Sequence, residues 1–590
     1  MRRFLVGFLA FIGLFALLVV IGLGGLTYWI VVQARHANPV PGKAILQLAV
    51  HGNPAETDNT SATLRRLVGG ARASSLRDLV DALDQARRDN RVLGVLVELS
   101  DAAPSLAAAQ ELRDAVARFR AAGKPAIAFA DSFGGARSSQ AFYLATGFDQ
   151  IWLQPAGEIG LAGFALDHPF FADTLKLIGV KPRFSQRQEY KGGIDMFVDT
   201  GLSAPLRTSL QGLIDDLFGQ LVDGVASGRK LAPEAVRALI DRAPLFGDEA
   251  QQAGLIDKVG YLDEARAEIR RRTEGGAGFV SLDTYLADVG PPNQQGAKIA
   301  LIYGVGPVVR GGDDDDGDGL GGSDTLSADT VAKAFRSAAA DSDVRAIVFR
   351  VDSPGGSYVA SDTVWREVKR ARNAGKPVVA SMGGVAASGG YFVSMAADRI
   401  IAEPGTLTGS IGVYSGKFVL AGLWDKLGVH WDELQAGANA GAESPNHDFT
   451  DAQWQRFQSS LDHIYADFTR RVADDRKLAP AKLDDVARGR VWTGRQAVAL
   501  GLADATGGFG DAVTAAKQLA RLAPDAPVKL EQYPPEKSAF ERALKLLGEI
   551  DANVGGLRLT ARLAATLAPL LQRVDTLLRA DTLTAPVEPH

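Results

Sequence analysis

The chain carries two copies of one sequence pattern, and this duplication constrains the fold more than any other feature. AGKPAIAF at 122–129 matches AGKPVVAS at 374–381, and the segment 142–163 matches the segment 391–412. The spacing between the copies changes by three residues because the first copy has a longer loop at 130–138. A repeat of about 250 residues has the length of a whole domain, not of a solenoid unit. The sequence therefore predicts two tandem domains with the same fold.

Each copy alternates short apolar strands with amphipathic helices. In the second copy AIVFRV at 346–351 has the apolar, β-branched composition of a buried strand, and PVVASM at 377–382 predicts the next one. Between them, 361–375 has helical spacing and ends at a glycine, with a proline just beyond. Strands and helices in this rhythm are typical of a right-handed, parallel α/β unit. We therefore expect both domains to be of the α/β class.

The N-terminus has the features of a membrane anchor. Phe4 to Val32 contains no charged residue, and Arg2 and Arg3 precede it. A helix of that length exceeds the hydrocarbon core of roughly 30 Å, and the basic flank keeps the N-terminus in the cytoplasm. A cleaved signal peptide is the alternative, but its apolar region is normally shorter. We expect a single-pass protein of the bacterial inner membrane whose two domains lie in the periplasm.

The predicted organisation has four parts, with the join between the domains near the Pro-Pro pair at 291–292. They are a membrane anchor at 1–40, an N-terminal domain at 41–290, a C-terminal domain at 291–535 and a helical extension at 536–590. The extension is rich in Leu, Ala and Arg, and we expect it to serve packing or subunit contact, with a peripheral membrane role as the alternative. The acidic run GGDDDDGDGLGG at 311–322 lacks the glutamate of a calcium loop, so we expect a mobile loop there.

Charge and cysteine content exclude several classes of function. The formal net charge is −5, which provides no bulk attraction to nucleic acid. There is no cysteine, which removes disulfides, thiolate nucleophiles and zinc–thiolate sites together. We therefore expect no metal, no cofactor and no nucleic-acid partner.

Ser388 is the candidate nucleophile. It follows a predicted strand and a glycine-bearing turn at 383–384, and it precedes Gly389 and Gly390. This context predicts that the hydroxyl lies at the N-terminus of a helix, where backbone amides and the helix dipole favour negative charge. The amide of Gly389 could then donate to the oxyanion of an acyl-transfer intermediate.

A second oxyanion donor is expected from DSPGGS at 352–357, because this segment ends the preceding strand of the same predicted sheet. Glycines let the backbone approach a substrate closely, so the amide of Gly356, or of Gly355, is the candidate. Alone, each glycine pair could be only a tight strand-to-helix turn. Together in one domain they favour an oxyanion hole.

A serine nucleophile needs a base, and none of the seven histidines lies in a recognisable triad motif. Lys191, in RQEYKGG of the first copy, is the alternative. Aligning the copies pairs Lys191 with Ala440 and Ser388 with Ser139, so each copy lacks one of the two groups. To act near neutral pH, the pKa of the lysine must fall by about 3 units, or roughly 4 kcal/mol, which burial can supply. On these grounds alone a solvated surface lysine stays open.

The motifs GKPVVASMGGVAASGGYFVS, EPGTLTGSIGV and DSPGGS, with YKG upstream, closely resemble the signal peptide peptidase A family, also called protease IV, in its long bacterial form with two tandem domains. The resemblance covers most of the chain. It implies a Ser-Lys dyad of Ser388 and Lys191, and a supporting Ser410 that hydrogen-bonds the lysine amine. It also implies a fold similar to Clp protease and crotonase, a tetrameric homo-oligomer, and remnant signal peptides as substrates.

Two other functions are compatible with the sequence. A crotonase-like acyl-CoA enzyme would also present two amides to a thioester oxyanion, although Ser388 and the expected periplasmic location argue against it. A catalytically inactive membrane scaffold could be built from the same fold, although the chain keeps Ser388, Lys191, Ser410 and both glycine pairs. Our prediction is a membrane-anchored serine endopeptidase that acts on peptides.

Overall fold

The computed structural model describes residues 40–56, 74–100, 104–135, 138–273, 275–311, 325–535 and 582–584. Residues 1–39 of the predicted anchor, the acidic residues after Gly311 and residues 536–581 of the predicted helical extension lie outside these ranges. Within the ranges, no helix has the length and apolar character needed to cross a membrane.

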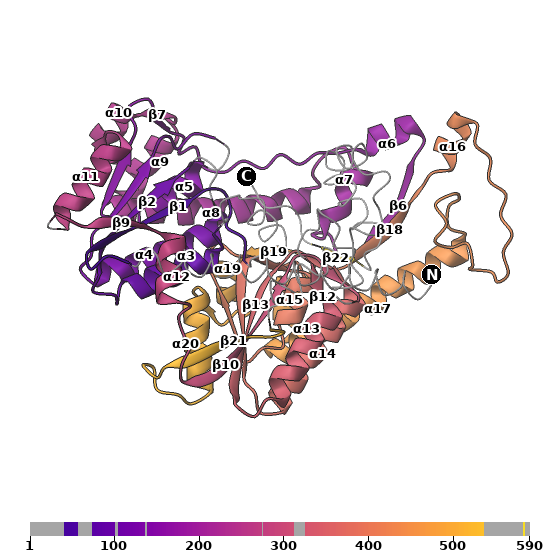
Figure 1. The fold of residues 1–590 in the computed structure, drawn as a ribbon. Coiled ribbons are helices and arrows are strands. Elements are labelled where there is room, and N and C mark those ends of the chain that lie inside the picture. The colour runs from indigo at the N-terminus through magenta and orange to yellow at the C-terminus, as the bar shows by residue number, and fades with distance from the viewer. Residues whose placement is uncertain are drawn as a thin grey trace, which may run out of the picture.

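The N-terminal domain is built on a six-stranded parallel sheet in the order β8–β4–β3–β2–β1–β9. Its strands are β1 (Ala44–Val50), β2 (Val92–Leu99), β3 (Ala126–Ala130), β4 (Gln150–Leu153), β8 (Lys258–Val259) and β9 (Gly278–Ser281). Helices cover both faces, among them α3 (Leu76–Ala86), α4 (Leu106–Ala121), α5 (Ser138–Ala145) and α11 (Leu262–Arg272) (Figure 1).

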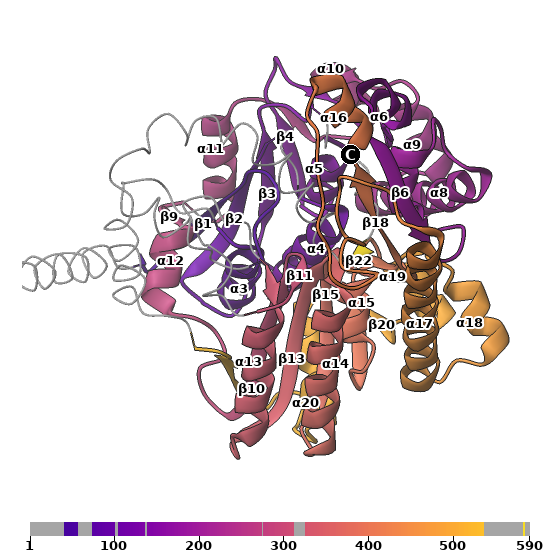
Figure 2. The ribbon, with the colours of Figure 1, turned by 90° about the vertical axis from the view of Figure 1, so that its right-hand side faces the viewer.

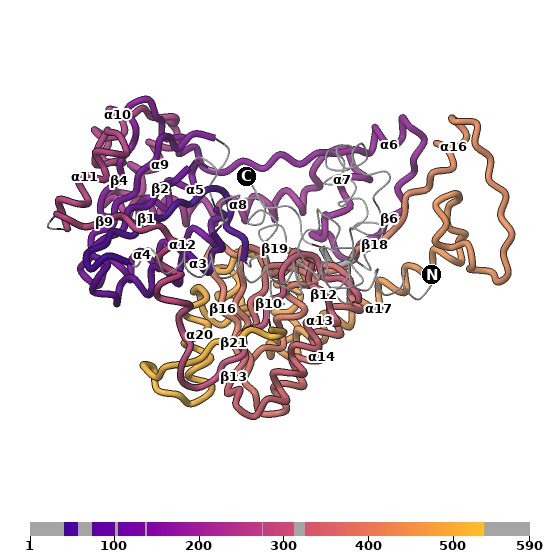
Figure 3. Tube along the Cα trace, in the orientation of Figure 1, coloured from indigo at the N-terminus to yellow at the C-terminus, as the bar shows by residue number. Residues whose placement is uncertain are grey.

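The C-terminal domain has an eight-stranded sheet, and six of its strands repeat the first sheet in the order β20–β16–β15–β13–β10–β21. These six are β10 (Ala297–Val305), β13 (Val344–Ser353), β15 (Val378–Ala387), β16 (Arg399–Ala402), β20 (Ala505–Thr506) and β21 (Val528–Gln532), and the other two, β17 (Leu407–Gly409) and β19 (Val491–Thr493), continue from β15. These strands pair in parallel in the same order along the chain as in the first domain. The predicted duplication of an α/β fold is confirmed, and the two halves lie against each other (Figure 3).

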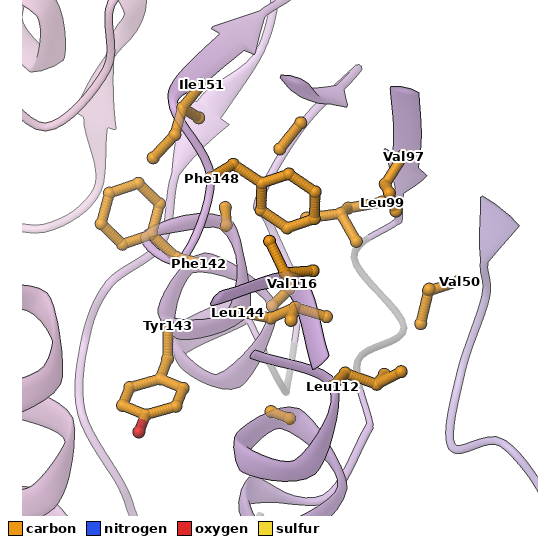
Figure 4. Packing of buried hydrophobic residues seen from close by; sticks show 14 of the residues in the cluster. Val50, Val97, Leu99, Leu112, Val116, Phe142, Tyr143, Leu144, Phe148 and Ile151 are labelled. Carbon is orange, nitrogen blue, oxygen red and sulfur yellow. The ribbon is translucent and has the colours of Figure 1, made fainter. Parts of the chain in front are cut away.

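The core of the first domain lies between its sheet and the helices α4 and α5. Figure 4 shows Val97, Leu99 and Ile151 of the strands directed toward Val116 and Phe142 of the helices. All are nearly inaccessible to solvent, as continuous apolar strands covered on both faces require. Burying side chains of this size stabilises the fold by about 1.5–3 kcal/mol each.

Two local expectations differ from the structure. The helix predicted at 361–375 is α14 (Tyr358–Asn373), which starts earlier because the Ser357 hydroxyl accepts from the amide of Ala360 and caps it. The turn expected at 383–384 is wrong: both glycines lie within β15, where the pairing with β13 shifts register between Val351 and Ser353. A β-bulge, not a turn, accommodates them.

A two-stranded arm connects the halves. The strand β6 (Lys181–Gln186) of the first copy pairs antiparallel with β18 (Tyr414–Val419) of the second. The helices α6 (Ala172–Ile178) and α16 (Ala421–Leu427) lie at the far end of the arm (Figures 1 and 2). A strand of the first copy is thereby paired with a strand of the second copy. This pairing places the residues that follow β6 next to the C-terminal domain.

A buried charge cluster joins the two domains. Arg350 of β13 forms ion pairs of 2.8 Å with Glu56 and 2.9 Å with Glu111 of α4, and its side chain is 2% exposed. Glu403, which follows β16, is also buried. Desolvation and the nearby Glu111 carboxylate raise the pKa of Glu403 well above its ordinary value of 4.5, which favours the neutral form of this third acid.

Replacing Arg350 by methionine should destabilise the protein strongly. The change leaves Glu56 and Glu111 buried without their cation, and breaking a buried pair in this way costs about 3–5 kcal/mol. Urea unfolding of the full-length chain measures the loss. Arg271→Met, which removes an exposed ion pair with Glu268, is the control and should change nothing measurable. A loss for Arg350→Met below about 1 kcal/mol would contradict this account.

Candidate active site

Ser388 lies at the tight junction between β15 and α15 (Gly389–Ser394). Its backbone has φ 56° and ψ −114°, a conformation that non-glycine residues rarely adopt and that is often held at functional sites. The amide of Ser388 donates to the carbonyl of Gly409 at 2.8 Å, and this bond supports the junction from β17 (Leu407–Gly409). The side chain is fully buried and lies at the start of a helix, as the sequence predicts.

Lys191 reaches Ser388 by way of the arm. After β6 the chain stays on the C-terminal domain, where the amide of Arg187 donates to the carbonyl of Val413 at 2.8 Å. Four residues later, Lys191 Nζ lies 2.8 Å from Ser388 Oγ. The two residues are 197 positions apart in the sequence and come from opposite copies, so the arm is what brings them together.

Ser410 completes a three-point contact with the lysine amine. Lys191 Nζ lies 2.9 Å from Ser410 Oγ and 2.8 Å from the Ser410 carbonyl oxygen. Ser410 also has a positive φ, of 54°, which turns both of its oxygens toward the amine. The structure thus brings together the three side chains that the sequence singled out, Ser388, Lys191 and Ser410.

The amine is isolated from water. Lys191 is 1% exposed, and desolvation lowers its pKa well below the ordinary value of 10.5. A neutral amine has two N–H groups and one lone pair. Donation to the two oxygens of Ser410 leaves the lone pair for the hydroxyl proton of Ser388.

The two oxyanion candidates lie next to each other. A Cβ added at Gly389 would be 3.0 Å from the backbone nitrogen of Gly356. Gly356 itself has φ 154°, and a Cβ there would be 2.2 Å from the carbonyl oxygen of Val308, so only glycine fits. Gly355 also has a positive φ, of 106°. The backbone of Gly356 therefore lies beside Gly389, the residue that follows Ser388.

The strand that carries Gly356 is part of a small separate sheet. β14 (Gly355–Ser357) lies between β11 (Val308–Val309) and β22 (Thr582–Thr584), and β12 (Leu326–Ser327) pairs with β11. β22 pairs antiparallel with β14, with Leu583 opposite Gly356. The described part of the predicted helical extension is therefore a strand, and it lies along the candidate oxyanion segment.

The equivalent position in the first copy has no such site. Ser139, the counterpart of Ser388, lies in α5, and its hydroxyl accepts from the amide of Gly163 at 3.0 Å and contacts the carbonyl of the same residue. Ala440, the counterpart of Lys191, lies in a turn after the arm. Each half alone thus lacks the pairing that Ser388 and Lys191 make together.

One contact to Lys191 comes from outside the sequence motifs. Gly412 of the motif EPGTLTGSIGV and Gly489, which belongs to no motif, lie next to each other against the Lys191 side chain and backbone. A glycine followed by a strand is too common a pattern to single out position 489 from the sequence. Within the described ranges, no three His, Asp or Glu side chains converge as metal ligands.

The chain matches the model of peptidase family S49 over residues 118–274 and 370–523, one region in each copy. It is 31% identical over 533 residues to Protease 4 of Salmonella typhi, covering 86% of this chain and 83% of that protein. Protease 4 of Haemophilus influenzae is 32% identical over 480 residues, with 78% and 75% covered.

Two shorter similarities accompany these. A protein of Enterococcus faecium named for signal peptide peptidase SppA is 32% identical over 220 residues, covering 37% of this chain and 62% of that protein. Among solved structures, a ClpP1 mutant from Listeria monocytogenes aligns with a TM-score of 0.24 and 14% identity, over 36% of this chain and 94% of the other.

Proposed function

Since the chain belongs to peptidase family S49 and is therefore a serine protease, we propose that it cleaves peptides with a Ser388–Lys191 dyad. The observation that carries this proposal is the lysine amine, buried and 2.8 Å from Ser388 Oγ. The family assignment favours a peptidase over an acyl-CoA enzyme. An inactive scaffold would not require a desolvated lysine against a strained serine.

In the first half of the reaction, neutral Lys191 takes the proton of Ser388 as Oγ attacks the peptide carbonyl. The amides of Gly356 and Gly389 donate to the oxyanion of the tetrahedral intermediate. Lys191 then gives its proton to the leaving amine, the C–N bond breaks and an acyl-enzyme remains.

In the second half, water enters and Lys191 removes a proton from it as its oxygen attacks the ester carbonyl. The same two amides stabilise the second oxyanion. The C–O bond to Ser388 breaks, and the proton returns from Lys191 to Oγ. Ser410 holds the amine toward Ser388 throughout and touches no substrate atom in this scheme.

We propose remnant signal peptides as the substrate class and the inner membrane as the location, with the domains in the periplasm and the protein assembled as a homotetramer. The support for the substrate and the location is the uncharged segment from Phe4 to Val32 and the similarity to a protein named for signal peptide peptidase. The homotetramer rests on the family resemblance of the sequence motifs alone. The full-length chain in phospholipid vesicles, given a synthetic signal peptide, tests the substrate. Fragments from the apolar core of the peptide, seen by mass spectrometry, are expected; an intact peptide beside cleaved soluble casein would refute this substrate class.

The pH dependence of kcat/KM should report the lysine. Only the neutral amine can accept the serine proton, so kcat/KM should rise with pH through the lowered pKa of Lys191 and level off well below 10.5. Stopped assays on a fluorogenic peptide, over the range in which the fold is intact by circular dichroism, measure the profile. A rate that keeps rising about tenfold per pH unit up to pH 10 would show a lysine of ordinary pKa.

The position of β22 predicts an effect of the C-terminus on substrate binding. A peptide that pairs with β14 would compete with Thr582–Thr584, which are tethered and thus at high effective concentration. A chain that ends before Thr582 should show a severalfold lower KM with unchanged kcat. A chain that ends after Thr584 keeps the strand and is the control. Equal KM values for the two truncated chains would contradict the prediction.

A further inference from the structure

The turn from Ala487 to Arg490, just before β19 (Val491–Thr493), bonds to both sides of the Lys191 site. The carbonyl of Arg490 accepts from the amide of Ser410 at 2.8 Å. The carbonyl of Arg488 accepts from the amide of Tyr190 at 3.2 Å. This one turn is therefore hydrogen-bonded both to Tyr190, the residue before Lys191, and to Ser410, whose oxygens contact the lysine amine.

Gly489, in the middle of this turn, lies directly against the lysine. Its φ is 85°, and a Cβ there would be 2.5 Å from the backbone nitrogen of Lys191 and 2.6 Å from its Cβ. A Cβ at Gly412 would be 2.9 Å from Gly489 Cα and 3.1 Å from Lys191 Cδ, so the two glycines lie next to each other against the lysine. A side chain at either glycine would therefore press on the lysine or on the other glycine.

The side chains of the turn fix the chain just before Lys191. The Arg490 guanidinium lies 4.1 Å from the centre of the Tyr190 ring and 5.1 Å from that of Trp492. Arg488 forms an ion pair of 2.5 Å with Glu189. This pair is partly exposed and contributes little, whereas a guanidinium stacked on an aromatic ring holds that ring in one orientation.

We propose that Arg488, Gly489 and Arg490 form a positioning turn that sets where the Lys191 amine lies relative to Ser388. The inference deepens the proposed dyad and rests on it. A displaced base loses rate steeply, because about 1 Å of misplacement can cost 100-fold. A displaced lysine also admits water, which returns its affinity for protons toward that of a solvated amine. If the turn had only a structural role, altering it would lower the stability of the protein without changing the pKa of Lys191.

Gly489→Ala tests the proposal. We expect kcat/KM to fall about 100-fold with KM nearly unchanged, and the acid limb of the pH profile to move to higher pH. The matched control is Gly501→Ala, at the C-terminus of α19 (Gly494–Leu500). Gly501 has the similar φ of 82°, but a Cβ there would meet only Leu478 and Lys482, at 3.5 Å or more. This control should keep the rate and the acid limb of the unaltered chain.

A second pair of variants covers the case in which Gly489→Ala fails to fold. Tyr190→Phe keeps the ring under Arg490 and should keep the pH profile. Tyr190→Leu removes the ring and should lower kcat and move the acid limb to higher pH. The proposal is overturned if Tyr190→Leu leaves the acid limb in place, or if Gly489→Ala and Gly501→Ala behave alike.

Lys191→Ala, assayed on the same peptide, separates this inference from the proposed dyad. If Lys191→Ala keeps activity, the dyad is wrong and the turn has no base to position. If Lys191→Ala is inactive while Tyr190→Leu retains the acid limb of the unaltered chain, the dyad stands and only the positioning turn is refuted.

Discussion

Ser388→Ala should reduce kcat by about 10⁵- to 10⁶-fold, the scale seen when the nucleophile of a serine protease is removed. In the proposed mechanism the Ser388 hydroxyl becomes acylated, and its Oγ lies 2.8 Å from the lysine amine. The fold should be unaffected, because the change removes one oxygen from a junction held by backbone bonds to Gly409 and Phe392. Active-site titration and peptide hydrolysis by the full-length chain measure the loss.

The control for Ser388→Ala is Ser139→Ala, its counterpart in the first copy. The Ser139 hydroxyl bonds only to Gly163 among its described partners, so this variant should hydrolyse peptides at the normal rate. An acylating inhibitor should label the unaltered chain and Ser139→Ala but not Ser388→Ala. Labelling of Ser388→Ala at another serine, with retained turnover, would refute the assignment.

Lys191→Met should reduce kcat by about 10²- to 10⁴-fold, the contribution of a general base. The methionine has a similar length and no charge, so the buried site stays filled. Because the dyad acts as a unit, the double variant with Ser388→Ala should be no less active than Ser388→Ala alone. Additive losses would indicate that the two groups work independently.

Stability should respond to Lys191→Met in the opposite sense to activity. The unfolded chain holds the lysine proton up to pH 10.5, whereas the folded chain releases it at the lowered pKa of Lys191. Between these values the unfolded state binds more protons, so the lysine penalises folding less as the pH rises. The stability of the unaltered chain relative to Lys191→Met should therefore increase with pH up to 10.5, as urea unfolding can measure.

Lys417→Met is the matched control for a buried lysine. Lys417 lies on β18 and donates to the carbonyls of Ala442 and Ser444, and burial lowers its pKa too. Removing the Lys417 amine should loosen the loop that contains Ala442 and Ser444 and leave most of the peptidase activity. Equal loss of activity in Lys417→Met and Lys191→Met would mean that the arm, rather than the base, had been disturbed.

The parts of the structure that the sequence predicted are those encoded locally. AIVFRV and PVVASM are apolar, β-branched runs that can be buried only inside a parallel sheet, and they form β13 and β15. The glycine pair after Ser388 marks a close approach of the backbone, because a Cβ at Gly390 would be 2.4 Å from the carbonyl oxygen of Ser353. The bulge at 383–384 was missed because a glycine pair predicts a turn equally well.

The sequence therefore determines which parts the chain contains: two copies of one α/β domain, a candidate nucleophile and candidate oxyanion glycines in the second copy, and a candidate base in the first. Only the tertiary structure decided that Lys191 meets Ser388, because the pairing of β6 with β18 is a contact between copies with no local signal. The lowered pKa of the Lys191 amine was also decided only by the tertiary structure. Desolvation is a property of the assembled interface, and the pKa of Lys191 falls only where Ser410, Gly412 and Gly489 close around it.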